Sequence, residues 1–231
     1  MCGRFSITLE AEEIQLKLGL GELPEDWKPR FNVAPSQPVA VVLDPDHRDV
    51  HWMMWGLVPF WAKSTGIGSR LINARAETVA EKSAFRQAFQ QRRCLILADG
   101  FYEWLKPGSQ GAASVPYYFH EKHGLPFTFA GLWDRWQDQN GNELQSCTII
   151  TCPANKVVQP IHDRMPVILD EKARWEWLAP LANPALQALL RPVDDGFLER
   201  YAVSRIVNNP RVDAAECLAP QPGQDSLFQV E

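Results

Sequence analysis

The sequence predicts a single-domain α+β protein whose mixed, largely antiparallel β-sheet is barrel-like and carries short peripheral helices. Many short apolar segments, bounded by polar, glycine or proline residues, have the length of strands. The few helix-like segments are scattered among them without the regular alternation of a βαβ protein. The 231 residues contain no internal repeat, low-complexity stretch or long linker. Residues 2–231 are therefore interpreted as one domain.

The strands are predicted from apolar segments and the turns that flank them. Residues 94–98 form a continuous apolar run, which is typical of a buried strand. A polar turn at 44–49 separates two strand candidates, and Asn140-Gly141 is a strong turn signal between two more. The predicted strands cover residues 4–7, 38–43, 51–55, 94–98, 116–120, 127–132, 146–151 and 165–169.

Two longer helices are predicted in the first half of the chain. Thr8 is a candidate cap for a helix over residues 9–18, which has acidic residues in its first turn and Gly19 and Gly21 at its end. A second helix is predicted over residues 77–90, because alanine and phenylalanine pairs recur there at i,i+4 spacing.

The second half of the chain is predicted to hold shorter helices and two less regular segments. Residues 171–178 form one short helix, and residues 184–190 form another with Asn183 as its cap. Residues 105–115 are rich in glycine, serine and alanine, which indicates a mobile loop. The tail after Arg211 is expected to be weakly ordered.

Composition excludes several classes of protein. Apolar residues make up 45% of the chain and charged residues 22%, as in an ordinary soluble globular protein. The net charge of -5 argues against a general polyanion binder, although it leaves room for a local basic groove. Five cysteines without CxxC spacing fit reduced thiols. No apolar run has the length of a membrane span. We therefore expect a cytoplasmic protein without membrane contact.

Motifs for common cofactors and metals are missing from the sequence. There is no GxGxxG, Walker loop, HExxH or GxSxG pattern. His120 and His123 form an HxxH pattern, but no further ligand-type residues lie at metal spacing, so they are interpreted as surface groups. The sequence predicts neither a metal site nor a cofactor.

Cys2 is the most unusual candidate for chemistry. Removal of Met1 would expose an α-amine and a thiol on neighbouring carbons. The amine has an ordinary pKa of about 8 and the thiol one of about 8.5, so both can act as nucleophiles near neutrality. An amine condenses with an aldehyde to a Schiff base, and the thiol can then close a five-membered thiazolidine. The alternative interpretation is that Cys2 is a small apolar residue packed under the first strand.

Three polar clusters interrupt apolar stretches. Asn73 and Arg75 alternate with apolar residues, so both lie on one side of an extended segment. Glu103 lies among aromatic residues after a buried strand, where desolvation raises a carboxyl pKa towards neutrality. His162 lies near Arg164 at the entry to a strand. Each residue also has a structural interpretation: Asn73 as a turn former, Glu103 in an ion pair, and His162 as a surface group.

Together these segments resemble the SRAP family of SOS-response-associated, abasic-site-processing proteins. The resemblance extends in family order from Cys2 to about residue 209 and does not include residues 105–115 or the tail. Its motifs are Met1-Cys2-Gly3-Arg4-Phe5, Asn32-Val33-Ala34-Pro35, Trp55-Gly56-Leu57-Val58-Pro59-Phe60-Trp61, Ile72-Asn73-Ala74-Arg75-Ala76-Glu77-Thr78, Ala98-Asp99-Gly100-Phe101-Tyr102-Glu103-Trp104 and Ile161-His162-Asp163-Arg164-Met165-Pro166.

The resemblance implies roles for individual residues. Cys2 matches the residue that crosslinks to abasic sites, and Asn73 the amide that orients the adduct. Glu103 matches the acid/base, and His162 the residue that assists ring opening and crosslink reversal. Arg4, Arg75 and Arg164 match positions that contact DNA phosphates. Phe60 and Trp61 lie in the loop that resembles the one that wedges against bases, and Pro35 matches a further DNA-binding position. The family typically carries tryptophan at or near both aromatic positions, so Phe60 departs from its pattern.

The implied function is crosslinking of Cys2 to the ring-opened abasic aldehyde in single-stranded DNA, as part of the response to DNA damage. This is a lyase-type activity, with possible autoproteolytic removal of Met1. The implied partner is single-stranded DNA containing abasic sites. We expect a monomer, associated with the nucleoid when it is bound to DNA. Two alternatives are a thiol peptidase with Cys2 as nucleophile and His162 as base, and a module that binds single-stranded DNA reversibly.

Overall fold

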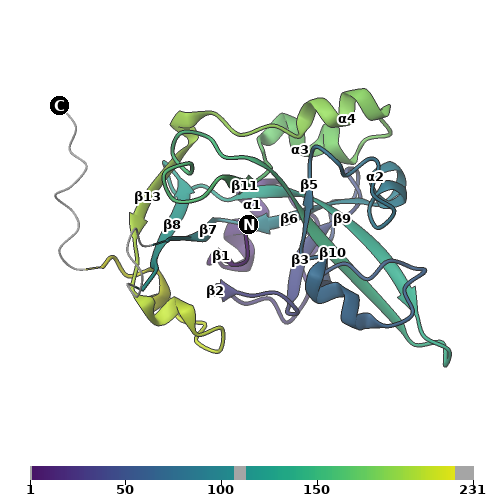
Figure 1. Ribbon diagram of the computed structural model, residues 1–231, viewed down its shortest axis with the longest axis horizontal. Coiled ribbons are helices and arrows are strands. Elements are labelled where there is room, and N and C mark those ends of the chain that lie inside the picture. Colours follow the sequence, from purple (N-terminus) through teal and green to yellow (C-terminus); the bar gives the residue numbers. More distant parts are fainter. Residues whose placement is uncertain (1, 107–112, 222–231) are drawn as a thin grey trace.

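The computed structural model describes residues 2–106 and 113–221, and it shows two β-sheets around a shared apolar core (Figure 1). The larger sheet contains β3 (Pro38–Val42), β4 (Val50–Trp55), β5 (Asn73–Arg75), β6 (Arg93–Ala98), β9 (Phe127–Gln137), β10 (Glu143–Pro153), β11 (Arg164–Pro166) and β12 (Ile168–Leu169). Five of its strands pair in a closed ring in the order β10–β4–β3–β6–β9 and back to β10. This ring is a small barrel. Within the described residues, β10 pairs in parallel with β4 and β5, and every other pairing of named strands is antiparallel.

The smaller sheet continues directly from the barrel. Its strand order is β13 (Leu198–Ala202), β8 (Val115–Glu121), β7 (Gly100–Leu105), β1 (Phe5–Ile7) and β2 (Arg30–Val33). Only Asp99 separates β6 from β7, and its buried carboxylate accepts hydrogen bonds from Ser6 Oγ and Thr8 Oγ1, both at 2.6 Å. The predicted fold class, a mixed and largely antiparallel barrel-like sheet with short helices, is confirmed.

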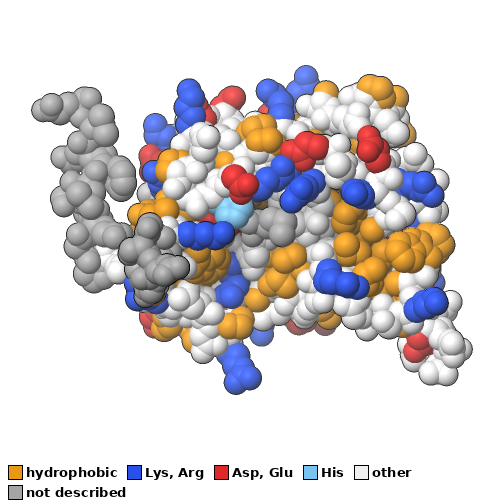
Figure 2. Space-filling model, viewed as in Figure 1, with side chains coloured by type: hydrophobic (Ala, Val, Ile, Leu, Met, Phe, Trp, Pro, Cys, Tyr) orange, Lys and Arg blue, Asp and Glu red, His pale blue; other side chains and the backbone are white. Residues whose placement is uncertain are grey.

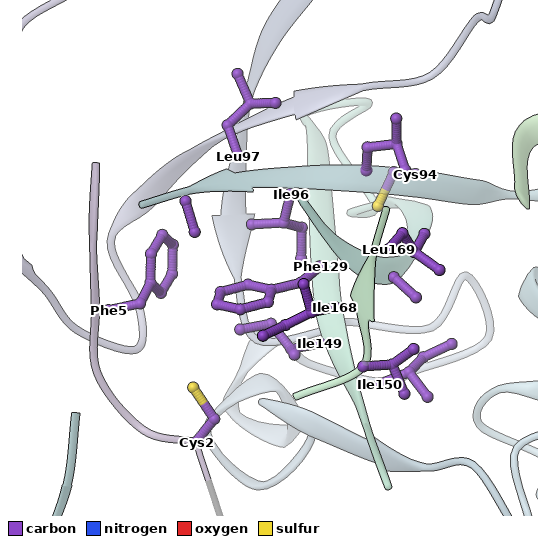
Figure 3. Close-up of a cluster of buried hydrophobic side chains, with 14 of the residues drawn as sticks. Cys2, Phe5, Cys94, Ile96, Leu97, Phe129, Ile149, Ile150, Ile168 and Leu169 are labelled. Carbon is purple, nitrogen blue, oxygen red and sulfur yellow. The ribbon is translucent and has the colours of Figure 1, made fainter. Parts of the chain in front are cut away.

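Aromatic side chains from both sheets fill the shared core. The ring of Phe5, on β1, lies edge-on to Trp55 at 5.2 Å between centroids and to Phe129 at 5.6 Å. Figure 3 shows part of this cluster, in which Phe5 and Cys2 lie beside the isoleucine and phenylalanine side chains of the barrel strands. Because these side chains are almost fully buried, removal of one by mutation to alanine is expected to cost about 3–5 kcal/mol.

Short helices and turns cover the outside of the sheets. They are α1 (Ala11–Leu18), α2 (Arg86–Gln91), α3 (Glu171–Leu178) and α4 (Asn183–Leu189), with 3-10 turns η1 (Thr65–Arg70), η2 (Asp195–Phe197), η3 (Arg205–Asn208) and η4 (Ala215–Leu218). Trp177 of α3 is fully buried, and its Nε1 donates to the carbonyl of Cys94 on β6 at 3.0 Å. No helix in the described part of the chain combines the length and apolar character needed to cross a membrane.

Several predicted strand boundaries need correction. Residues 165–169 are two strands, since β11 pairs with β10 and β12 with β9. Val167 lies between them and hydrogen-bonds to both β10 and β9: its N–H donates to the Ile150 carbonyl, and its carbonyl accepts from the Ala130 N–H. The strands that were not predicted are β2, β5, β7 and β13.

Three helix predictions were wrong in detail. Thr8 does not cap α1, because both its N–H and its hydroxyl bond to Asp99. Residues 77–85 form turns stabilised by bonds such as Glu81 N–H to the carbonyl of Thr78, so only the end of the predicted 77–90 helix is helical, as α2. Asn183 is the first residue of α4, and Ala182 occupies the cap position.

The tail is more ordered than expected as far as residue 221. The Asp213 carboxylate accepts from the backbone N–H groups of Phe31 and Asn32, at 2.6 and 2.9 Å. Cys217 of η4 is fully buried in a second apolar cluster on the outer face of the smaller sheet, with Tyr102 and Val207. Of the predicted 105–115 loop, residues 107–112 lie outside the described residues. On either side of them, β7 ends at Leu105 and β8 begins at Val115.

Candidate functional site

Cys2 lies three residues before the start of β1 and is enclosed at the junction of the two sheets. Its side chain is fully buried, and Figure 3 shows the sulfur directed into the cluster that holds Phe5 and Phe129. Burial raises the pKa of the Cys2 thiol well above its usual range, and the nearby Glu103 carboxylate adds to this rise. The thiol is therefore protonated at neutral pH. The packing interpretation of Cys2 agrees with this position, and its reactivity stays a prediction.

Asn73 joins the chain terminus to the barrel. It opens β5, where its backbone lies opposite Ile149 of β10, and its Nδ2 donates to the carbonyl of Cys2 at 2.7 Å. The side-chain oxygen Oδ1 is buried and has no hydrogen-bond partner among the described residues. One amide group thus fixes the position of Cys2 and keeps an acceptor for a further donor.

Glu103 is almost completely enclosed, with 3% of its surface exposed. Phe5 pairs with Phe101, and the antiparallel register of β1 and β7 therefore places Glu103 across from Gly3. Burial raises the pKa of Glu103 to about 7, and the Asp163 carboxylate makes a smaller contribution in the same direction. A carboxyl group with this pKa can both give and take a proton near neutrality. The burial predicted from its aromatic neighbours is present.

His162 precedes β11 and shares one ring nitrogen between two groups. The backbone N–H of Arg164 lies 3.0 Å from Nδ1 and can donate only when Nδ1 is unprotonated. Asp163 Oδ1 lies 2.9 Å from the same atom and can accept only when Nδ1 carries a proton. Burial lowers the pKa of His162, which favours the neutral ring near neutrality. The two contacts therefore require different states of Nδ1, one without a proton and one with it.

The three predicted phosphate-contacting arginines have different surroundings. Arg4 donates to Asn32 Oδ1 at 2.6 Å and to the Val207 carbonyl at 2.7 Å, which ties it into the smaller sheet. Arg164 forms a bidentate pair with Glu77, at 2.6 and 3.0 Å, and also donates to the Thr151 carbonyl. Arg75 is exposed at the end of β5. A phosphate therefore has direct access to Arg75 but has to compete with Glu77 for Arg164.

Phe60 and Trp61 project from the loop that follows β4. Their exposed fractions are 52% and 48%, which is unusual for side chains of this size. Pro35 lies in the neighbouring turn between β2 and β3, where the N–H of Ser36 bonds to the carbonyl of Trp55 at the end of β4. The exposed aromatic pair and this turn are thus attached to the same strand end.

Most of these groups lie on strands that pair with β10, so they are arranged along its length. Along β10, Trp55 at the end of β4 lies opposite Cys147, Asn73 opposite Ile149 and Arg164 opposite Pro153. At about 3.4 Å per residue, these six steps along the strand span roughly 20 Å. Figure 2 shows Lys and Arg side chains gathered on the same face, around a histidine near its centre and a hydrophobic patch beside it. Among the described residues, no three His, Cys, Asp or Glu side chains gather where they could hold a metal ion.

Two residues that position the predicted arginines Arg4 and Arg164 were not predicted from the sequence. Asn32 is buried, accepts from Arg4 and donates through Nδ2 to carbonyls of η3 and the segment after it. Glu77 is the carboxylate partner of Arg164. Both lie inside the quoted motifs, but nothing in the sequence indicates which distant arginine each one contacts.

The fold and the enclosed cysteine define an α+β barrel protein whose N-terminal segment lies inside its candidate site. Comparison with known families matches residues 1–210 to SOS response associated peptidase (SRAP), so the chain belongs to the SRAP family.

Relatives of known name and structure extend over nearly the whole chain. The abasic site processing protein YoqW of Bacillus subtilis (strain 168) is 41% identical over 223 residues, which cover 94% of this chain and 99% of that protein. The abasic site processing protein HMCES of Xenopus tropicalis is 32% identical over 266 residues, covering 95% and 78%. A solved protein from Bacteroides thetaiotaomicron superimposes with a TM-score of 0.80 at 28% identity, covering 91% of this chain and 97% of that one.

Proposed function

We propose that the protein processes abasic sites in single-stranded DNA by linking Cys2 covalently to the open-chain sugar, once Met1 has been removed. One observation carries the proposal: a buried carboxyl group with a pKa of about 7, on Glu103, lies within electrostatic reach of the N-terminal cysteine. The names of YoqW and HMCES support abasic sites as the substrate.

The reaction follows from the chemistry of an aminothiol. The Cys2 amine attacks the aldehyde carbon to form a carbinolamine, and loss of water gives a Schiff base. Glu103 donates the proton that the departing hydroxyl requires and takes one back as the carboxylate. The thiol then adds to the same carbon, a C–S bond forms, and the thiol proton passes to the nitrogen. The product is a thiazolidine, with water as the only leaving group.

Ring closure protects the DNA strand. A Schiff base acidifies the neighbouring carbon of the sugar and promotes β-elimination, which cleaves the strand. A thiazolidine has no C=N bond and so removes this route. The Asn73 amide, which holds the Cys2 carbonyl, limits the orientations of the amine towards the aldehyde. His162 in its neutral form accepts or relays a proton during opening of the sugar ring.

The exposed loop and the cations supply strand binding. Phe60 and Trp61 are available for stacking on bases, which contributes about 1–3 kcal/mol per base without sequence preference. Arg75 offers a phosphate contact beside the site. Binding by a few local groups is compatible with the net charge of -5.

The raised thiol pKa of Cys2 weighs against the thiol peptidase. Such a peptidase needs a thiolate nucleophile, whereas burial here keeps the sulfur protonated. Thiazolidine formation instead begins with the amine. Peptide turnover that is abolished by alkylation of Cys2, with no adduct on abasic DNA, would favour the peptidase.

The test is to incubate the purified protein with a single strand bearing one abasic site and to resolve the products on a denaturing gel. We expect an SDS-resistant adduct with the wild type and with the control Cys217→Ala, and none with Cys2→Ala. Cys2→Ser keeps the amine but lacks the sulfur, so it should give a labile adduct and more strand cleavage. A stable adduct from Cys2→Ala overturns the proposal, as does full activity in protein whose intact mass retains Met1. Equal, wholly reversible binding to intact and abasic strands would instead show a plain binding module.

A further inference from the structure

We infer that Ser146, Asp134 and Trp136 are positioning residues that hold the Phe60–Trp61 loop in the shape in which it meets a DNA strand. The inference rests on the proposed function and assigns a task in it to three side chains of the β9–β10 hairpin.

The chain leaves β4 and crosses the face of this hairpin. The N–H of Gly56 donates to the Cys147 carbonyl at 2.8 Å, which ends the pairing of β4 with β10. Gly56 has a φ of 124°, a conformation that favours glycine. An added Cβ would also lie 2.7 Å from the Gly68 carbonyl oxygen. The backbone turns at this glycine and passes over β10 and then over β9.

Three side chains hold the crossing segment at alternate residues. The N–H of Val58 donates to Ser146 Oγ at 2.8 Å, and the N–H of Phe60 donates to Asp134 Oδ2 at 3.1 Å. Trp136 Nε1 donates to the Ala62 carbonyl at 2.7 Å. A turn bond from Ala62 N–H to the Pro59 carbonyl, at 2.9 Å, closes the loop between these points.

The hairpin register explains why these three side chains act together. Ser146 lies directly opposite Asp134 in the antiparallel pair, and Trp136 follows two residues later on β9. Side chains alternate between the faces of a strand, so all three lie on the face that the loop crosses. Ser146 and Asp134 are buried, with exposed fractions of 0% and 4%, and Arg92 forms an ion pair with Asp134 at 3.2 Å.

The consequence is a loop whose backbone is held while its two aromatic side chains remain exposed. A flexible loop would lose conformational entropy when bases stack on it, and this loss weakens binding. A loop held in advance avoids that loss. The three residues should therefore affect the binding of the strand, and not the bond-forming steps at Cys2.

The experiment compares Ser146→Ala and Trp136→Phe, each of which removes one hydrogen-bonding group, with matched controls. Thr148→Val removes a hydroxyl two residues along β10 that has no hydrogen-bond partner among the described residues. Trp133→Phe changes a tryptophan on the opposite face of β9. Each variant is assayed for its Kd for an intact single strand and for the rate of adduct formation as a function of abasic-strand concentration.

We expect both test variants to weaken strand binding by about fivefold, the factor that one ordinary hydrogen bond contributes to an equilibrium. Their maximal rate at saturating strand should equal that of the wild type, and the controls should bind normally. In a background in which Phe60 and Trp61 are both alanine, Trp136→Phe should cause no further loss. An unchanged Kd, a lowered maximal rate, or the same loss in the alanine background overturns the inference.

Hydrogen exchange separates this inference from the proposed function. Without any DNA, Ser146→Ala and Trp136→Phe should speed exchange of the Val58 and Phe60 amides, whereas the controls should not. If the wild-type protein forms no adduct, the proposed function is wrong but the positioning role is not affected. If the Val58 and Phe60 amides exchange at the wild-type rate in the test variants, the positioning role is wrong but the proposed function is not affected.

Discussion

At the scale of single residues, the carboxyl group of Glu103 opposes ionisation of the Cys2 thiol. Both are buried, and the charge of Glu103 contributes to the raised pKa of Cys2. The thiol therefore loses its proton more readily while Glu103 is neutral. The site therefore favours a protonated thiol and a carboxyl group that titrates near neutral pH, which suits a reaction that begins with the amine and needs proton transfer.

The pKa of Glu103 predicts a dependence of stability on pH. Its folded-state pKa of about 7 lies above the ordinary 4.5, so the folded protein holds this proton more tightly than the unfolded chain. The stabilisation is present below the ordinary pKa and is lost as pH rises towards 7, an effect of up to about 3 kcal/mol. Glu103→Gln cannot ionise, so its free energy of unfolding relative to the wild type should rise between roughly pH 4 and pH 8.

Urea unfolding at several pH values measures this difference. The wild-type rate of adduct formation should also show an inflection near pH 7 that Glu103→Gln lacks. A stability difference that is constant across the range would contradict the buried titration.

At the scale of elements, β10 determines which distant segments meet. Its strand character was predicted over residues 146–151, but its four neighbouring strands were not, because pairing depends on contacts far apart in sequence. The missed strand β7 has a similar cause. Its adjacent residues Phe101 and Tyr102 are both buried, Phe101 in the shared core and Tyr102 in the second cluster with η3 and η4. Because both faces of β7 are covered, no alternation of apolar and polar residues marks it as a strand.

The segment around Asp213 supplies a prediction at this scale. Its carboxylate binds Arg30 and the N–H groups of Phe31 and Asn32, so it fastens residues after 211 to β2. Asp213→Ala leaves these donors without their acceptor and should lower the free energy of unfolding by about 2–3 kcal/mol. Asp195→Ala, which removes an exposed carboxylate beside Lys156, is the control and should have little effect. Equal urea midpoints for the two variants would show that the tail is not part of the cooperative fold.

At the scale of the whole molecule, a negatively charged chain carries a local group of cations. The sequence predicted this arrangement from its net charge of -5 and the resemblance, together with the fold class and the single domain. The sequence could not predict that Arg164 forms an ion pair with Glu77 or that Arg4 donates a hydrogen bond to Asn32. Those pairings depend on contacts between strands: β5 and β11 both pair with β10, which brings Glu77 and Arg164 together across 87 positions. The pairing of β1 with β2 brings Arg4 and Asn32 together across 28 positions.

Salt dependence tests which cations meet the DNA. Arg75 is exposed, so Arg75→Ala should lower the slope of log K against log salt for a single strand by about 0.7. Arg164→Ala should lower the slope by less, because Glu77 already neutralises that charge. Arg48→Ala, which removes a guanidinium stacked over Trp175, is the control. An unchanged slope for Arg75→Ala would remove that residue from the contact surface.

The pairing of β1 with β7 sets a time limit on processing of the chain terminus. Cys2 becomes enclosed only after Glu103 has been synthesised, about a hundred residues later. A ribosome adds about 5–20 residues per second, so the terminus stays accessible for about 5–20 seconds during synthesis. On the proposed function, which requires removal of Met1, a separate enzyme is therefore expected to act on the nascent chain. A protein that misses this interval would keep blocked the amine on which the proposed function depends.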